Sequence, residues 1–240
     1  GVDLNFTSVD LTLSLDDFSS RILEPAMAVL AASIEADSYS MYKDVNQMVD
    51  SDGSALAFLD ILKGRKALVD SLAPADNNRT AILSTTHNIK LIDAVKGLFN
   101  DTSTISKQYR EGMTGRTAGF DFYESTHAGD HTTGDAAKTT TCTVNGASQT
   151  GASVTIANAG SKTFKKGDIV TFVGCNSVHP ETKTSTGTLQ QFVVTADAAS
   201  TTLAISPSIV TSGATQNVSA SPTNGGAVVK VGAGASELLN

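Results

Sequence analysis

The first part of the chain carries a helical pattern of hydrophobic positions, introduced by a short strand. Leu11, Leu13 and Leu15 alternate with polar residues, which predicts a half-buried strand. Apolar residues then recur at three- and four-residue steps, and they predict one long amphipathic helix through Leu23, Met27, Leu30, Ile34, Met41, Val45 and Met48. Pro25 lies inside this pattern and has no amide donor, so we expect a kink or a restart there. The roughly 25 residues after Pro25 would extend about 37 Å, a length that suits a strut.

Two more helices and two strands are expected before residue 130. A second helix is predicted over residues 54–72, followed by a strand over 81–84, and Thr86 is expected to cap a third helix that ends near Asn100. Residues 105–111 are expected to add a helical turn or two before a strand over 118–125, where Phe120 and Phe122 share one face. The expected inward residues of the two helices are Leu56, Leu59, Leu62 and Leu68, and then Leu91, Ile92, Val95 and Leu98.

The second part of the chain changes to short strands separated by Gly and Asn turns, a spacing typical of sandwiches and barrels. Strands are predicted over residues 140–144, 153–157, 168–173, 190–195, 202–205, 217–220 and 227–231. Lys166-Gly167-Asp168 is interpreted as the tight turn before the third of these strands. An adhesive use of that tripeptide is the rarer alternative.

Composition supports the same division. Residues 1–129 hold 29 of the 41 charged side chains, and the remainder of the chain is rich in Thr, Ser, Gly and Val. Helix formers therefore give way to strand formers, and the predicted fold class is α+β, with a mixed helix and strand unit followed by an all-β unit.

Charge and cysteine usage exclude several classes of protein. The net charge of -7 argues against a protein that grips nucleic acid through a basic surface. The first residues have the wrong charge for a signal peptide, and the apolar stretch over 25–34 is too short to span a bilayer, so we expect a soluble chain. It begins with Gly, which fits either processing or a piece of a longer product. Cys142 and Cys175 cannot build a zinc site unaided, and we expect two buried free thiols.

No catalytic, cofactor or metal site is predicted. The chain has no GxSxG elbow and no Walker loop, and residues 232–237 are interpreted as a flexible segment rather than a dinucleotide turn. His127 and His131 stand four apart like zinc ligands, but Gly129 and Gly134 indicate a loop. The motif at residues 50–53 is half a calcium loop and is better explained as a turn between helices. Neither His87 nor His179 has an evident partner nearby in the sequence. Four N-x-S/T sequons, which matter only in a eukaryotic secretory pathway, begin at Asn5, Asn78, Asn100 and Asn217.

Several strings, in order, resemble the coat-protein family of short-tailed phages that infect enteric bacteria, a branch of the Hong Kong 97-like capsid fold. They begin at Asp10 (DLTLSLDDFSSRILEPAM), Asp93 (DAVKGLFN), Ile105 (ISKQYREGMTGRTAGFDFYES), Lys165 (KKGDIVTFVG), Leu189 (LQQFVVTAD), Ile205 (ISPSIV) and Gln216 (QNVSASP). The resemblance implies a spine helix after Pro25 and peripheral-domain elements within residues 1–130. It also implies a β-barrel insertion domain over 131–232 and the start of an axial-domain return over 233–240.

The function that this resemblance implies is mechanical. We expect a major capsid protein of a tailed phage or prophage that assembles with copies of itself around DNA, in the virion, after assembly in the bacterial cytoplasm. Scaffolding and portal proteins are the expected partners, without sequence-specific nucleic-acid binding, membrane contact or enzymatic activity. The barrel is expected to stabilise the subunit or its contacts with neighbours. The alternatives are a surface-exposed or secreted module whose Thr-rich β domain recognises glycan or a host receptor, and a hydrolase with dispersed Ser, His and Asp groups.

Overall fold

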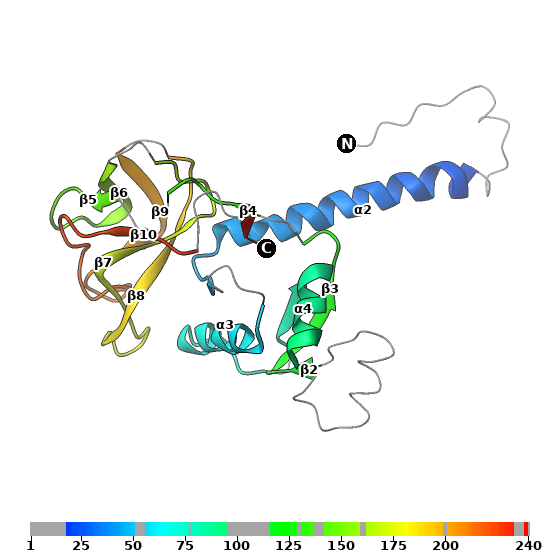
Figure 1. Cartoon of the computed structure of the whole chain (residues 1–240), viewed down its shortest axis with the longest axis horizontal. Helices are drawn as coiled ribbons and strands as arrows, with labels where there is room; N and C mark the ends of the chain where they lie inside the picture. Colours follow the sequence, from blue (N-terminus) through cyan, green and yellow to red (C-terminus); the bar gives the residue numbers. More distant parts are fainter. Residues whose placement is uncertain are drawn as a thin grey trace.

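The protein is described by a computed structural model. The structure describes residues 18–50, 56–76, 78–95, 116–128, 131–136, 142–158, 162–198, 201–232 and 238–239. The predicted first strand, the helical turns at 105–111, the turn at 50–53 beyond its first residue, and Asn100 lie outside these residues. A β-barrel stands at one end of a long helical rod, and a smaller group of helices and strands lies along the rod (Figure 1).

The rod is one continuous helical segment of three types. A π-helical turn, η2 (Ser19–Leu23), leads into α2 (Glu24–Tyr39), which continues as the 3-10 helix η3 (Ser40–Asp44). Pro25 lies in the first turn of α2 and cannot donate a hydrogen bond to the turn before it, and the helix type changes just before it. Leu23 and Glu24 keep right-handed helical backbone angles, so the helix continues through Pro25 without a restart. The predicted extension to Met48 is wrong, because Val45 adopts an extended backbone conformation.

The smaller group contains two helices and a three-stranded sheet. Helix α3 (Phe58–Asp70) precedes β1 (Thr80–Leu83) and α4 (Thr85–Val95), and β2 (Arg116–Thr117) and β3 (Phe120–Glu124) follow. The strand order is β1-β3-β2, in which β1 runs parallel to β3 and β2 runs antiparallel to it. Phe120 and Phe122 do lie on one face, with their ring centroids 6.4 Å apart.

Two details of these helices differ from the predictions. Leu59, Leu62 and Leu68 are exposed, and the half-buried α3 residues that face the sheet, across a crevice, are Ile61 and Gly64 instead. The cap of α4 is Ser84 rather than Thr86: Asn88 N donates to the Ser84 carbonyl at 2.9 Å, and His87 N donates to Ser84 Oγ at 3.4 Å. Leu91 is buried, as predicted, at 0% exposure.

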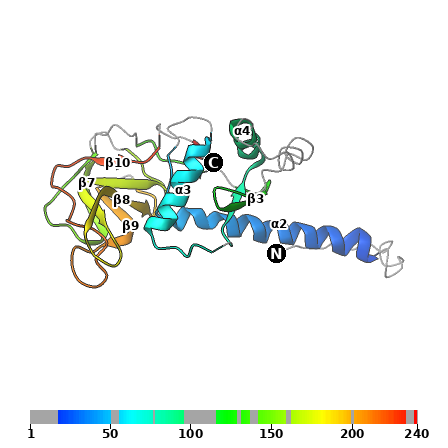
Figure 2. The same ribbon diagram turned by 90° about the horizontal axis from the view of Figure 1, so that it is seen from below.

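The second unit is a nearly closed barrel of six strands in the order β10-β7-β8-β9-β6-β5. The strands are β5 (Cys142–Val144), β6 (Gly151–Asn158), β7 (Ile169–Val178), β8 (Ser185–Val194), β9 (Thr202–Ile209) and β10 (Val228–Lys230). Thr143 bridges Ala227 beside β10, which brings the two edges of the sheet together. Figure 2 shows the barrel from below, with α2 leading away from it. A separate two-stranded pairing joins β4 (His131–Thr132) to β11 (Leu238–Leu239).

The barrel has its own apolar core. Phe172 and Phe192 are fully buried, with ring centroids 5.5 Å apart, and the aliphatic core residues around them come from every strand of the barrel. Fully burying each such side chain stabilises the fold by about 1.5–3 kcal/mol. The free thiols of Cys142 and Cys175 lie in this core, as predicted.

Six of the seven predicted strands of this unit are confirmed, and the one over residues 217–220 is wrong. Asn217 Oδ1 accepts a hydrogen bond from Val210 N at 2.9 Å, and its Nδ2 donates to the Ser208 carbonyl at 2.7 Å. A side chain therefore makes the contacts that a strand ladder would make, and only Val218 forms an isolated bridge, to Ser177. Within the described part of the chain, no helix is long and apolar enough to cross a membrane.

Candidate functional site

The candidate functional site is the junction where the end of the rod meets the barrel, together with the apolar surface of the rod. The junction comprises residues 42–48 at the end of the rod, residues 131–134 where the chain enters the barrel, the turn before β7, and Gln191 on β8. It joins the end of the rod to segments far along the chain, among them Gln191, which is 143 positions from Met48.

A buried carboxylate organises the barrel side of the junction. Asp168 is 0% exposed, and its Oδ1 lies 2.9 Å from His131 Nε2. Its Oδ2 accepts hydrogen bonds from Gly134 N at 3.0 Å and from Lys165 N at 2.9 Å. A buried carboxylate is tolerated when its oxygens are satisfied in this way. Asp168 therefore ties the incoming chain to the start of β7, and the tripeptide at 166–168 is the predicted turn, with its carboxylate unavailable to an adhesive partner.

A buried lysine on the last strand of the barrel binds the same entering segment. Lys230, on β10, is 0% exposed, and its Nζ donates to Thr133 Oγ1 at 2.7 Å and to the Gly134 carbonyl at 3.1 Å. Gly134 has to be glycine, because a Cβ there would lie 2.2 Å from the Thr163 carbonyl oxygen. The entry and the exit of the barrel are consequently fixed side by side.

The rod contacts this cluster through its last helical turn. The Tyr42 ring meets His131 edge-on, with centroids 6.0 Å apart, and Lys166 Nζ lies 2.9 Å from Asp44 Oδ1. Gly167 has a φ of 97°, and a Cβ there would meet Lys43 Cγ at 3.1 Å. The turn before β7 thus fits closely against the rod because Gly167 has no side chain.

Beyond the rod, one glutamine side chain pairs with the linker as a neighbouring strand would. Gln191 Oε1 accepts from Met48 N at 2.8 Å, and Gln191 Nε2 donates to the Met48 carbonyl at 3.0 Å. Asn46 Nδ2 donates to the Gln191 carbonyl at 3.1 Å. These three bonds explain why the helix ends before Val45, since an extended linker can present its backbone groups to the barrel.

The rod itself exposes most of its apolar side chains. No residue of α2 is buried. Larger side chains along it are exposed by 40% at Leu23, 62% at Met27, 39% at Leu30 and 60% at Ile34. These four positions follow one another at four- and three-residue steps, so they form a single stripe, which we call the rod stripe.

The histidines considered from the sequence are distributed over separate environments. His127 Nδ1 lies 3.7 Å from Glu35 Oε2, whereas His131 lies in the junction. The pKa of Glu35 is lowered, mainly because its carboxylate accepts a hydrogen bond from Ser125. Within the described residues, no group of three or more His, Cys, Asp or Glu side chains could hold a metal ion.

Both remaining histidines do have local partners, contrary to the sequence interpretation. His87 Nδ1 lies 2.7 Å from Ser84 Oγ, a contact that belongs to the N-terminal cap of α4. His179 Nδ1 accepts hydrogen bonds from the backbone amides of Glu181 and Thr182 at 3.2 and 3.3 Å. Sequence reasoning did not single out Asp168, Lys230 or Gln191 as organising residues, although a lone charge or amide within an otherwise apolar strand pattern is a usable signal.

No family model matches the chain. No curated protein matches it either. Among solved structures, the chain is similar to the CUS-3 coat protein I-domain, with 31% sequence identity and a TM-score of 0.30. The match covers 37% of this chain and 93% of the I-domain chain.

Proposed function

We propose that this chain is a structural coat-protein subunit that assembles with copies of itself into the icosahedral shell of a tailed bacteriophage or prophage. The observation that carries the proposal is the rod stripe, an apolar surface on a long helix that the rest of the described chain does not cover. The ordered sequence segments that resemble the coat-protein family add to it. In this proposal, α2 acts as the spine helix of a Hong Kong 97-like fold, and the barrel is its insertion domain.

An uncovered apolar rod suits a subunit that is completed by its neighbours. Removing a side chain such as Met27 or Ile34 from water contributes about 1.5–3 kcal/mol, so the stripe favours association. In a closed shell the same weak contact is repeated by every copy, and the repeated contacts add up to a stable assembly. The satisfied polar groups of the junction support the second requirement of such a subunit, a fixed angle between its two parts.

The remaining features of the proposal follow from the shell role. The partners are other copies of the chain, together with scaffolding and portal proteins, and the location is the virion after assembly in the bacterial cytoplasm. The subunit performs no catalysis and contacts neither a membrane nor a specific nucleic-acid sequence. With a net charge of -7, the protein would confine packaged DNA without gripping its phosphates.

Electron microscopy and size-exclusion chromatography of the protein expressed from its complete gene test the proposal. Closed particles tens of nanometres wide are expected. Met27→Asp combined with Ile34→Asp should abolish particles while leaving the far-ultraviolet circular dichroism unchanged, because both side chains are exposed in the single subunit. Thr184→Asp, at an exposed barrel position, is the matched control and should still assemble. A discrete monomer from the complete gene would contradict the proposal.

The alternative of a glycan-binding module has little support in the barrel surface. Sugar-binding platforms use exposed aromatic faces. The aromatic side chains after residue 130 are Phe164, Phe172 and Phe192, and all three are buried in the barrel core. A glycan array probed with the purified chain should therefore give no signal above background, and a saturable signal would favour the alternative.

A further inference from the structure

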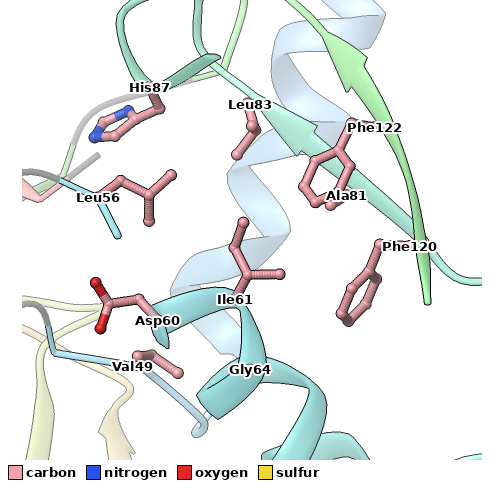
Figure 3. Close-up of a pocket in the computed structure, with 10 residues that line it drawn as sticks. All are labelled: Val49, Leu56, Asp60, Ile61, Gly64, Ala81, Leu83, His87, Phe120 and Phe122. Atoms are coloured by element: carbon pink, nitrogen blue, oxygen red, sulfur yellow. The ribbon is translucent and has the colours of Figure 1, made fainter. Parts of the chain in front are cut away.

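A crevice of about 290 Å³ lies between α3 and the sheet formed by β1 and β3. Its walls are mainly apolar, with Asp60 and His87 as the polar lining residues (Figure 3). Leu56, Ile61 and Leu83 point toward its centre, and Phe120 and Phe122 line one side. The two phenylalanine rings stand at 61° to each other. Phe120 is 8% exposed and Phe122 is half-buried, so Phe122 offers the larger ring surface to an aromatic occupant. The crevice lies apart from the junction and from the rod stripe.

Gly64 forms the floor of this crevice, and local sterics do not require a glycine there. Gly64 lies in the interior of α3, where glycine destabilises a helix by about 1 kcal/mol relative to alanine. A Cβ built at Gly64 would have no atom within 4 Å. The contrast with Gly134, where a Cβ would overlap the backbone of Thr163, is direct. The missing side chain at Gly64 therefore widens an apolar space instead of relieving a clash.

The crevice disfavours a negatively charged occupant. Asp60 Oδ1 accepts from Lys63 Nζ at 2.9 Å, and Asp60 Oδ2 accepts from Ala57 N at 3.1 Å. The bond to Lys63 is the main cause of the lowered pKa of Asp60, which keeps the carboxylate ionised at neutral pH. Lys63 neutralises much of this charge, so the main penalty for an anionic ligand is the loss of its hydration among the apolar walls. The Asp60 carboxylate already holds two donors and does not require a cationic ligand.

We propose that this crevice binds neutral, apolar molecules of one or two aromatic rings, with the ring packed against Phe120 and Phe122 and over the open floor at Gly64. Enclosed apolar cavities take up benzene-sized ligands, and this crevice, although open to solvent, has a comparable aliphatic and phenylalanine lining. Binding here is independent of the shell-building role, so either can hold without the other.

Indole is a suitable probe because the chain contains no Trp, and selective excitation of indole therefore reports the environment of the added molecule alone. Titration of the full chain with indole should give a saturable blue shift of its emission, with a dissociation constant of about 1 mM or tighter. Toluene should displace the indole, whereas benzoate, an anion of similar size, should not. The absence of a saturable shift, or equal competition by benzoate, would overturn the proposal.

Two variants locate the binding. Gly64→Leu should weaken indole binding at least about tenfold, since the new side chain occupies the floor of the crevice. Leu56→Phe fills the crevice from outside the helix and gives a second test if Gly64→Leu does not fold. Lys66→Leu adds the same side chain to an exposed position on α3, and the affinity of this variant for indole should equal that of the parent protein. Unchanged affinity in a folded Gly64→Leu or Leu56→Phe protein would show that indole binds elsewhere.

Discussion

Asp168 Oδ1 and His131 Nε2 lie 2.9 Å apart, on side chains that are 0% and 7% exposed. This pair, with the two backbone amides on Asp168 Oδ2, links the start of β7 to the segment that enters the barrel. The bonds are buried, so they resist the solvent screening that weakens surface ion pairs. The barrel side of the junction consequently converges on one carboxylate.

Replacement of Asp168 should destabilise the barrel strongly. Asp168→Ala removes three contacts and leaves one buried and one partly buried amide without their acceptor, so we expect a loss of about 3 kcal/mol in the free energy of unfolding. Urea denaturation followed by circular dichroism measures it. Asp197→Ala is the control, because exposed Asp197 caps a single amide, that of Lys166, and its loss should cost at most about 1 kcal/mol. Similar values for the two variants would argue against the role of Asp168.

Asp135 should make the barrel acid-sensitive. Its pKa is lowered, first because its carboxylate accepts a hydrogen bond from the Thr163 hydroxyl at 2.6 Å and next because it accepts one from the Thr163 amide. A carboxyl group with a depressed folded pKa contributes stability that is complete above the unfolded value, near 3.8, and that is lost as the pH falls below it. Asp135→Asn should flatten this part of the stability profile, measured by urea denaturation from neutral pH down through 3.8. An unchanged profile in the variant would contradict the assignment.

Cys175 should be unreactive in the folded chain. Burial raises the pKa of its thiol from 9.0 to about 12, so almost no thiolate is present near neutral pH. Labelling with a disulfide reagent should therefore be slow until a denaturant is added. Since the folded pKa is raised, the thiol contributes stability below pH 9.0 that is progressively lost as the pH rises toward about 12. Cys142→Ala isolates the signal of Cys175, and rapid labelling of that variant in buffer would refute the prediction.

Gln191 should hold the linker without stabilising the barrel core. Gln191→Leu removes both side-chain bonds to Met48, and we expect faster hydrogen exchange at the Met48 amide with the barrel amides unchanged. Gln191→Glu keeps the acceptor for Met48 N and loses only the donor, so its effect should be intermediate. Each lost bond corresponds to about 1 kcal/mol. Equal exchange at Met48 in all three proteins would contradict this role.

Two glycines should respond in opposite directions to the same substitution. Gly134→Ala places a Cβ 2.2 Å from the Thr163 carbonyl, so the barrel entry must shift and the melting temperature should fall. Gly64→Ala meets no atom within 4 Å, and the better helix former should raise the stability of α3 by about 1 kcal/mol. Differential scanning calorimetry of the two variants checks both signs, and a stabilised Gly134→Ala protein would refute the steric argument.

The parts of the fold that follow from local periodicity could be predicted, and those set by long-range contacts could not. The strands near Asp168 and Gln190 were placed correctly because alternating β-branched residues and Gly turns are local signals. The end of the rod was missed because Val45 and Met48 continue the apolar spacing, while the linker is drawn into an extended form by Gln191, 143 positions away. The inward face of α3 was missed for a related reason: leucine spacing marks a helix, but which side faces the sheet depends on the rest of the chain, and that side carries Ile61 and Gly64.

The close approach of Lys230 to Thr133, at 2.7 Å, has a consequence for how such a protein can change over generations. A β module whose first and last segments are neighbours behaves as a cassette, because its removal or acquisition leaves the flanking ends almost where they were. The elements outside the module, such as the rod and the three-stranded sheet, can then retain their geometry while the module varies. Lineages that differ by an entire barrel could thereby preserve one underlying scaffold.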